Sequence, residues 1–248
     1  MSSISTRLQS NLQRIQDRIV KACDRSGREP GDVTLVAVTK YADLDWVRCL
    51  VDLGVSDLGE SRPQQIAERS RLLPGHIRWH LIGHLQRNKV ELVLPVCNRI
   101  HSVDSMRLLQ ALVKECEKRS AKAICDPLSP QEGAQRPRIL IEVNVSGESS
   151  KDGFDPEELI RVWPVVHQLP GLSIEGLMTM APQSDDPELS RLPFRRLREL
   201  RDRLSNEAKG VKFPDLSMGM SGDFEIGIEE GATLIRIGSS LFEGLTSS

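Results

Sequence analysis

One of the nine lysines in this chain, Lys40, comes directly after a strongly apolar segment, Val33–Thr39. An amine at the end of a buried strand is partly desolvated, and desolvation disfavours the charged ammonium form. The neutral amine is a nucleophile that condenses with a carbonyl to form a Schiff base. A lysine whose stem is buried while its head group reaches water is the alternative. Position alone leaves both interpretations open.

Two later segments carry hydroxyl groups and glycines of the kind that hold phosphate. The segment "LSMGMSGD" contains Ser217 and Ser221, and the segment "RIGSS" contains Gly238 and Ser239. Backbone N–H groups in such loops, together with hydroxyls, bind phosphate oxygens. Ordinary Gly/Ser turns are the alternative for each loop taken alone. The chain has no Walker A pattern, so a nucleoside triphosphate is not indicated.

A Schiff-base lysine beside a phosphate site indicates either a phosphorylated aldehyde cofactor or a sugar-phosphate aldolase that uses Lys40 on its substrate. Arg236 favours the cofactor, because a guanidinium two residues before Gly238 is placed to hydrogen-bond a pyridine nitrogen. An ion pair of Arg236 with Glu60, Glu142 or Glu225 is the alternative.

Other residues fall at predicted strand ends and are candidate cofactor contacts: Ser61, His80 and Met178. The spacing of His76, His80 and His84 by four residues would place them on one face of a helix. The segment "IRWHLIG" is typical of a strand, however, and four residues of strand span roughly 13 Å. Adjacent histidines of this set therefore cannot share one zinc ion, and no metal site is predicted.

Short apolar segments alternate with helical patterns along the whole chain, which indicates parallel βαβ units. Eight such units predict a (β/α)8 TIM barrel in a single domain, residues 1–248, with chemistry at the carboxyl ends of the strands. A doubly wound open sheet is the alternative. The expected strands are Val33–Thr39, Val55–Leu58, Arg78–Ile82, Arg99–Val103, Ile139–Val145, Leu172–Thr179, Asp215–Met218 and Thr233–Ile237.

The two ends of the chain and one inserted segment do not fit the alternation of strands and helices. Only Ser239–Ser248 follow the eighth strand, which is too short for a closing helix. An amphipathic N-terminal helix, residues 1–27, is expected to pack on the barrel and cover that gap. Residues Ala121–Pro137 are expected to form a surface loop.

Composition restricts the class of protein further. Hydrophobic residues make up 39% and charged residues 27%, and the net charge of −2 gives no reason to expect nucleic acid or an anionic membrane as partner. No apolar segment approaches the roughly 18 residues of a membrane span. The five cysteines are odd in number and form no C-x-x-C, which favours reduced thiols and a cytoplasmic protein.

Taken together, the motifs resemble a known family over Val33 to Phe242. They are "VAVTK", "LGES", "WHLIGHLQRNK", "HSVDS", "IEVNVSGESSKDGF", "IEGLMTM" and "LSMGMSGDFEIGIEEGATLIRIGSSLF". They are similar to those of the pyridoxal phosphate homeostasis proteins. The resemblance implies a barrel like the N-terminal domain of alanine racemase, pyridoxal 5′-phosphate (PLP) as cofactor, and a role in vitamin B6 and amino/keto acid balance. PLP-dependent apoenzymes or regulatory proteins are the implied partners.

Carried over by motif, Lys40 resembles the family's Schiff-base lysine and Arg236 the arginine beside the pyridine nitrogen. Ser217, Ser221, Gly238 and Ser239 match its phosphate pattern. Two positions depart from the family. Ser61 stands where an asparagine usually helps to hold the cofactor, and His84 stands where a proline is usual.

The same residues argue against efficient catalysis. An arginine donates its own N–H and leaves the pyridine nitrogen unprotonated, which weakens the ring as an electron sink. The sole tyrosine is Tyr41, and no second domain is expected to supply another acid/base group. We therefore expect a cofactor-binding protein rather than an enzyme, with a slow PLP-dependent racemase or transaminase as the alternative.

Overall fold

The computed structural model describes residues 3–125, 136–148, 151–182, 184–208 and 213–246. Its eight strands form a closed parallel barrel in the chain order β1 to β8, with β1 also paired to β8. The predicted TIM barrel is confirmed, and the open sheet is wrong. The strands are β1 Thr34–Val38, β2 Asp57–Glu60, β3 Arg78–Leu81, β4 Arg99–Val103, β5 Arg138–Glu142, β6 Ser173–Met178, β7 Asp215–Met220 and β8 Leu234–Ile237.

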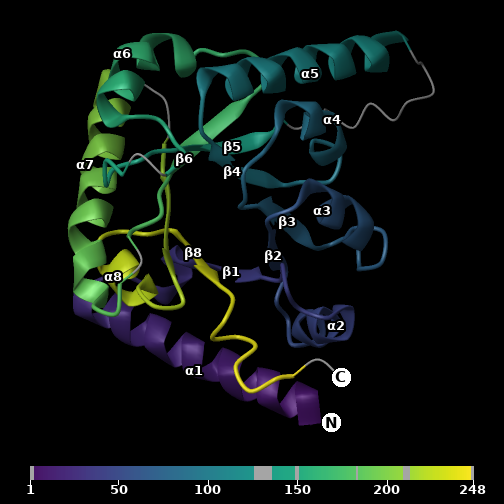
Figure 1. Cartoon of the computed structure of the whole chain (residues 1–248), viewed down its shortest axis with the longest axis vertical. Helices are drawn as coiled ribbons and strands as arrows, with labels where there is room; N and C mark the ends of the chain where they lie inside the picture. The colour runs from purple at the N-terminus through teal and green to yellow at the C-terminus, as the bar shows by residue number, and fades with distance from the viewer. Residues whose placement is uncertain (1–2, 126–135, 149–150, 183, 209–212, 247–248) are drawn as a thin grey trace.

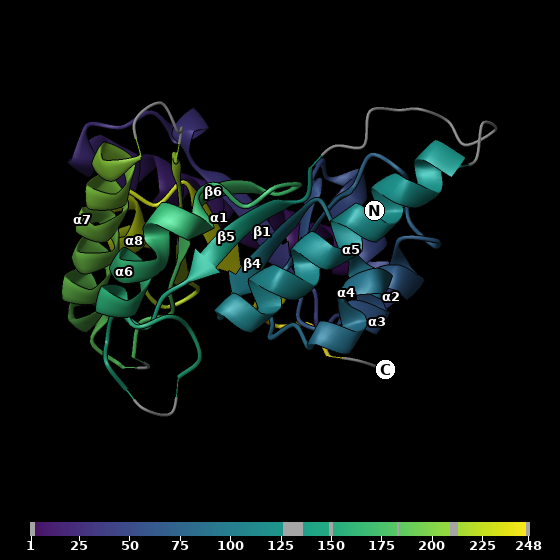
Figure 2. The same cartoon turned by 90° about the horizontal axis from the view of Figure 1, so that it is seen from above.

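Helices cover the outside of the barrel (Figures 1 and 2). Helices α2 to α5 lie on one side of it and α6 to α8 on the other. Within the described ranges, no helix is both long and apolar enough to cross a membrane. The helices are α1 Ser3–Ser26, α2 Leu44–Asp52, α3 Pro63–Arg69, α4 Val90–Val93, α5 Met106–Cys125, α6 Pro156–Val166, α7 Arg191–Glu207 and α8 Phe224–Glu229, with 3-10 turns η1 Pro30–Asp32, η2 Arg87–Lys89 and η3 Pro187–Ser190.

Helix α1 packs against α8 and α2, beside the segment that follows β8 (Figure 1). The Asn11 amide donates hydrogen bonds to the carbonyls of Leu241 and Glu243, at 2.9 and 3.0 Å. Arg28 donates to the carbonyls of Ile228 and Ala232, both at 2.8 Å. These bonds satisfy backbone carbonyls in the segment after β8 and around the end of α8.

The second strand differs from its predicted bounds. It was expected at Val55–Leu58 because the apolar residues lie there, but it runs from Asp57 to Glu60. Both carboxylates are buried, and each has a cationic partner, since Arg78 pairs with Asp57 and Arg69 with Glu60. The pattern of apolar residues does not reveal a strand that begins and ends with a buried, ion-paired carboxylate.

Two further segments differ from the sequence pattern. The segment "QRNKVELVL" was expected as one helix and forms η2 followed by the single turn α4. Strand β5 ends at Glu142, earlier than predicted, and Val143 continues only as an isolated bridge to Phe154. Most of the expected loop Ala121–Pro137 lies outside the described residues.

The interior of the barrel has an apolar layer and a polar layer. Val36, Leu140, Met178 and Leu234 form a separate buried cluster inside the strands. The main core lies between strands and helices. The strands also carry buried polar residues, which form the polar part of the interior. They are Asp57, His80, Arg99, His101, Glu142, Ser217 and Arg236.

Candidate functional site

A cavity of about 860 Å³ opens where the strands end and the following loops begin. That volume lies within the range of roughly 300–1,000 Å³ typical of small-molecule sites. Six of the predicted site residues line it: Lys40, Ser61, Ser221, Arg236, Gly238 and Ser239. His80, Met178 and Ser217 are not among its lining residues.

Lys40 lies in the turn between β1 and α2, two residues beyond the end of the strand. Its position left open a partly desolvated amine or a lysine whose head group reaches water, and the structure shows the second. Lys40 is exposed because the hydrogen-bonded strand ends at Val38 and the turn lies at the cavity. Its Nζ lies 5.1 Å from the centroid of the Tyr41 ring. The amine is therefore accessible to a ligand that enters the cavity.

Arg69, which sequence reasoning missed, fixes the turn that carries Lys40. Its guanidinium donates to the carbonyls of Thr39 and Ala42, at 2.9 and 2.7 Å, on either side of the lysine. It also pairs with Glu60 at 2.7 Å, and the Thr39 hydroxyl donates to the same carboxylate at 2.7 Å. Burial raises the pKa of Glu60, while Thr39 and Arg69 oppose that effect. These hydrogen bonds therefore fix the backbone on both sides of Lys40.

The two Gly/Ser loops meet at the cavity wall. The N–H groups of Gly238 and Ser240 both point to the Ser221 hydroxyl oxygen, at 3.3 and 3.4 Å. Gly219 has φ +94°, and a Cβ there would lie 2.8 Å from the Phe224 backbone. Only glycine permits this tight turn into α8. The arrangement gathers a hydroxyl and backbone N–H donors, as an oxyanion such as phosphate requires.

Arg236 crosses from the barrel interior to the cavity and is 4% exposed. Its guanidinium donates to the Ser217 carbonyl at 2.9 Å, to the Ser217 hydroxyl at 2.5 Å and to the Thr179 carbonyl at 3.0 Å. The remaining guanidinium hydrogens are available to a ligand. Burial lowers the pKa of Arg236 to about 10, partly opposed by Glu142 and Asp223, so it stays cationic at neutral pH.

The carboxylates considered as partners of Arg236 have other contacts. Glu60 pairs with Arg69, and Glu225 pairs with Arg18 at 2.9 Å. Glu142 acts on Arg236 electrostatically without a direct ion pair between them. Within the described part of the chain, Arg236 is therefore held by neutral oxygen acceptors.

His80 belongs to a chain of hydrogen bonds below the cavity that ends at Arg236. Its Nε2 lies 3.0 Å from Asp57 Oδ1, and its Nδ1 lies 2.9 Å from His101 Nε2. His101 Nδ1 lies 2.8 Å from the Ser217 hydroxyl, which accepts from Arg236. His80 and Ser217 are thus placed to orient Arg236 and not to touch a ligand in the cavity.

The donor-to-acceptor direction of these hydrogen bonds follows from the ionised carboxylate of Asp57 at the end of the series. Burial raises the pKa of Asp57, but hydrogen bonds from His80 and Arg78 outweigh it and hold the pKa below its usual value. An ionised carboxylate only accepts, so His80 carries its hydrogen on Nε2 and accepts at Nδ1 from His101. His101 in turn accepts from the Ser217 hydroxyl. Every donor therefore points away from Arg236 toward Asp57.

His101 was not singled out from the sequence as a site residue. It lies in the motif "HSVDS" on β4, next to β3, and it is fully buried. The available signal was a second histidine at an inward-facing position of the neighbouring strand. Met178, by contrast, packs into the apolar layer of the interior with Val36, Leu140 and Leu234.

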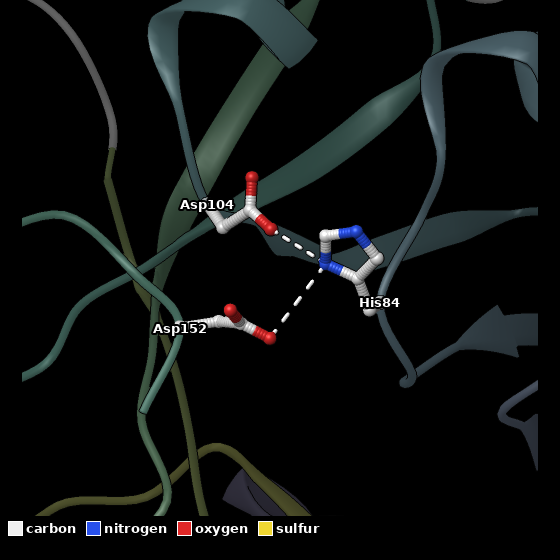
Figure 3. Close-up of side chains that lie close together, drawn as sticks. All are labelled: His84, Asp104 and Asp152. Carbon is white, nitrogen blue, oxygen red and sulfur yellow. Dashed lines mark ion pairs between the residues drawn. The ribbon is translucent and has the colours of Figure 1, made fainter. Parts of the chain in front are cut away.

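Acidic groups and a histidine also line the cavity, namely Glu142, Asp152 and His84. Burial raises the pKa of Glu142 to about 7; Asp104 and Asp152 raise it too, while Arg236 and His84 lower it. His84 Nδ1 lies 2.8 Å from Asp104 and 3.7 Å from Asp152 (Figure 3). His76, His80 and His84 do not come together, because His80 is buried in the barrel and the other two are exposed.

This chain forms a closed parallel barrel. An accessible lysine and two Gly/Ser loops lie at the carboxyl ends of its strands, and these features together define its class of protein. The family model described as the alanine racemase N-terminal domain matches residues 7–245, and the chain belongs to that family. Among its relatives is the pyridoxal phosphate homeostasis protein of Aquifex aeolicus, 39% identical over 232 residues, which cover 93% of this chain and 95% of that protein. Within the family, the chain is thus one of the pyridoxal phosphate homeostasis proteins.

Two solved structures are similar over nearly the whole chain. An unknown protein from Bifidobacterium adolescentis has a TM-score of 0.86 and 33% identity, covering 98% of this chain and 97% of that one. PipY of Synechococcus elongatus, with PLP bound, has a TM-score of 0.75 and 30% identity, covering 92% of this chain and 99% of that one.

We expect His80 and His101 to take up protons when the protein unfolds at acid pH. Burial lowers the pKa of His80 and of His101, the latter strongly, so both are neutral in the fold. An unfolded histidine has a pKa of about 6.5. Above that pH neither state binds the proton, and below it the unfolded state binds more, so stability is lost as pH falls.

The variant His101→Gln tests this expectation, because glutamine keeps one N–H donor and one acceptor. Each histidine contributes at most about 1.4 kcal/mol per pH unit to the slope. Urea unfolding between about pH 6.5 and 5 should therefore show a slope shallower by up to that amount in His101→Gln. His76→Gln, which removes an exposed histidine, is the matched control. Equal slopes for wild type and His101→Gln would mean that His101 is charged in the fold.

Proposed function

We propose that this protein binds PLP through Lys40 and serves in the intracellular homeostasis of that cofactor and in amino/keto acid balance. One observation carries the proposal: an accessible amine, an oxyanion-type pair of loops and a cationic N–H donor line the same cavity. The relative PipY, with PLP bound, supports it. The free thiols of Cys23, Cys49, Cys97 and Cys116 support a cytoplasmic location.

The residues fit each chemical part of PLP. Lys40 is exposed in the cavity and suits the aldehyde carbon. The Ser221 hydroxyl and the N–H groups of Gly238 and Ser240 suit the phosphate, with Ser239 beside them. The hydrogens of Arg236 that remain free suit an acceptor such as a pyridine nitrogen. Ser61 lines the same cavity and is one residue beyond β2.

PLP supplies an aldehyde for reversible condensation with amines and a ring that withdraws electrons best when its nitrogen is protonated. Arg236 remains cationic at neutral pH, so it would donate to that nitrogen and would disfavour a proton there. Ser217 and His101 hold the guanidinium in place. Arg69 holds the turn of Lys40. The residues therefore support binding and release of the cofactor better than turnover of amino acids.

A slow racemase or transaminase is the second candidate, and one observation favours it. Glu142 and His84 line the cavity, and the pKa of Glu142 is raised to about 7. A group that titrates near neutral pH is suited to move a proton. The limit on turnover thus rests on the arginine at the ring nitrogen rather than on a lack of acid/base groups.

Removal of the amine tests the cofactor site. Purified protein should show the absorbance of lysine-linked PLP, and borohydride reduction followed by peptide mapping should label Lys40. Lys40→Ala should lose that absorbance and the label, while its circular dichroism and melting temperature stay close to wild type, because Lys40 is exposed. Lys21→Ala, which removes an exposed lysine of α1 that does not line the cavity, is the control. A label that stays in Lys40→Ala would assign the link to another lysine.

Exchange of the α-hydrogen separates binding from turnover. Loaded protein is mixed with L-alanine and other L-amino acids in deuterated water, and loss of the α-hydrogen signal is followed by NMR. We expect exchange far below ordinary enzyme rates of roughly 1–1,000 per second. Borohydride-reduced protein gives the background. Exchange or racemisation at enzyme rates would establish the second candidate instead.

A further inference from the structure

We propose that His84, Asp104 and Asp152 form a binding site for a divalent first-row transition-metal ion, such as Mn²⁺ or Zn²⁺, at the mouth of the cavity. The three ligand atoms lie within 4.8 Å of one another. Figure 3 shows both carboxylates turned toward the same imidazole nitrogen, Nδ1 of His84. The site goes beyond the proposed function and does not depend on it.

The barrel itself brings these ligands together. His84 follows β3, Asp104 follows β4 and Asp152 lies in the loop after β5, and these strands are neighbours in the barrel. The carboxyl ends of parallel strands meet at one edge, so side chains distant in sequence converge there. The inner ligand, Asp104, has a side chain only 10% exposed, while Asp152 and His84 are 65% and 54% exposed and can adjust.

Glu142 provides an independent indication that the mouth is built for a cation. It is 5% exposed, lines the cavity, and accepts no hydrogen bond and forms no ion pair through its side chain within the described part of the chain. Asp104 and Asp152 are close enough to act on it as like charges. The Glu142 carboxylate oxygens are not fully buried, so they are open to the cavity and to a cation there. A divalent ion held by His84, Asp104 and Asp152 would offset the repulsion that the two aspartates exert on Glu142.

The geometry suits a metal with bonds of about 2.0–2.2 Å to nitrogen and oxygen, which separates neighbouring ligand atoms by roughly 3.0–3.4 Å. The separation of 2.8 Å between His84 and Asp104 is close to this range, and Asp152, at 3.7 Å, needs to move inward only slightly. Imidazole with carboxylates favours Mn²⁺ or Zn²⁺, whereas Mg²⁺ prefers oxygen ligands alone. The open coordination positions would face the cavity, for water or an oxygen of a bound ligand.

The test measures Mn²⁺ binding to the full chain after treatment with a chelator. Mn²⁺ is the probe because Zn²⁺ also binds thiols, and Cys49, Cys97 and Cys116 are partly exposed. Calorimetry and electron paramagnetic resonance should show one bound Mn²⁺ per chain. Pulsed resonance should show a directly bound imidazole nitrogen. Zn²⁺ should displace the ion at lower concentration than Mg²⁺ does.

Matched variants locate the site. His84→Asn and Asp152→Asn should each weaken Mn²⁺ binding at least tenfold, and His84→Asn should remove the nitrogen signal. Both residues are exposed, so neither change threatens the fold. His76→Asn and Asp202→Asn, exposed residues elsewhere, should bind Mn²⁺ as wild type does. No stoichiometric binding, or equal binding by His84→Asn and wild type, would overturn the proposal. Lys40→Ala should still bind Mn²⁺, which separates this result from that of the cofactor site.

Discussion

Arg236 is a buried cation without a direct carboxylate partner among the described residues, and the polar interior of the barrel is organised around it. Burying such a charge is costly unless its N–H groups are satisfied. The Ser217 carbonyl and hydroxyl and the Thr179 carbonyl do this at the guanidinium itself. Two neutral histidines continue this hydrogen-bond chain to the ionised Asp57, which is itself paired with Arg78. The carboxylates that act on Arg236 from a distance are Glu142 and Asp223.

This constraint connects the core to the proposed function. A guanidinium with a fixed orientation presents a donor to the cavity and cannot give up its proton at neutral pH. The same barrel edge presents Lys40 on a turn held by Arg69 and oxyanion donors on the loops after β7 and β8. In the proposed function, these groups would hold PLP at three points and Arg236 would keep its ring nitrogen unprotonated, so that the bound aldehyde could condense with amines while turnover stays slow.

Much of the fold could be predicted from the sequence, because each of the eight strands contains apolar residues between helical segments. The bounds were less predictable where buried charge replaces apolar residues, as at Asp57 and Glu60. Lys40 and the Gly/Ser loops were predictable because they follow apolar strands within a few residues. The sequence pattern does not show how far along the barrel axis a side chain lies. The two-residue period of a strand shows only which side chains face the interior. His80 and Met178 therefore face inward but lie below the cavity.

Residues that act through others were the hardest to foresee. Arg69 lies on α3 and reaches the turn of Lys40 across thirty residues of sequence. His101 and Ser217 are 116 residues apart and meet only because the barrel closes. The cluster of His84, Asp104 and Asp152 likewise comes from three loops, so no local spacing reveals it.

The protonation state of the PLP ring shows whether Arg236 acts on the cofactor as proposed. Protein loaded with PLP labelled with ¹⁵N in the ring can be measured by NMR at neutral pH. We expect the chemical shift of an unprotonated pyridine nitrogen that accepts a hydrogen bond from Arg236, and a change in that shift in Arg236→Gln. A ring nitrogen that is protonated in the wild-type protein would contradict it.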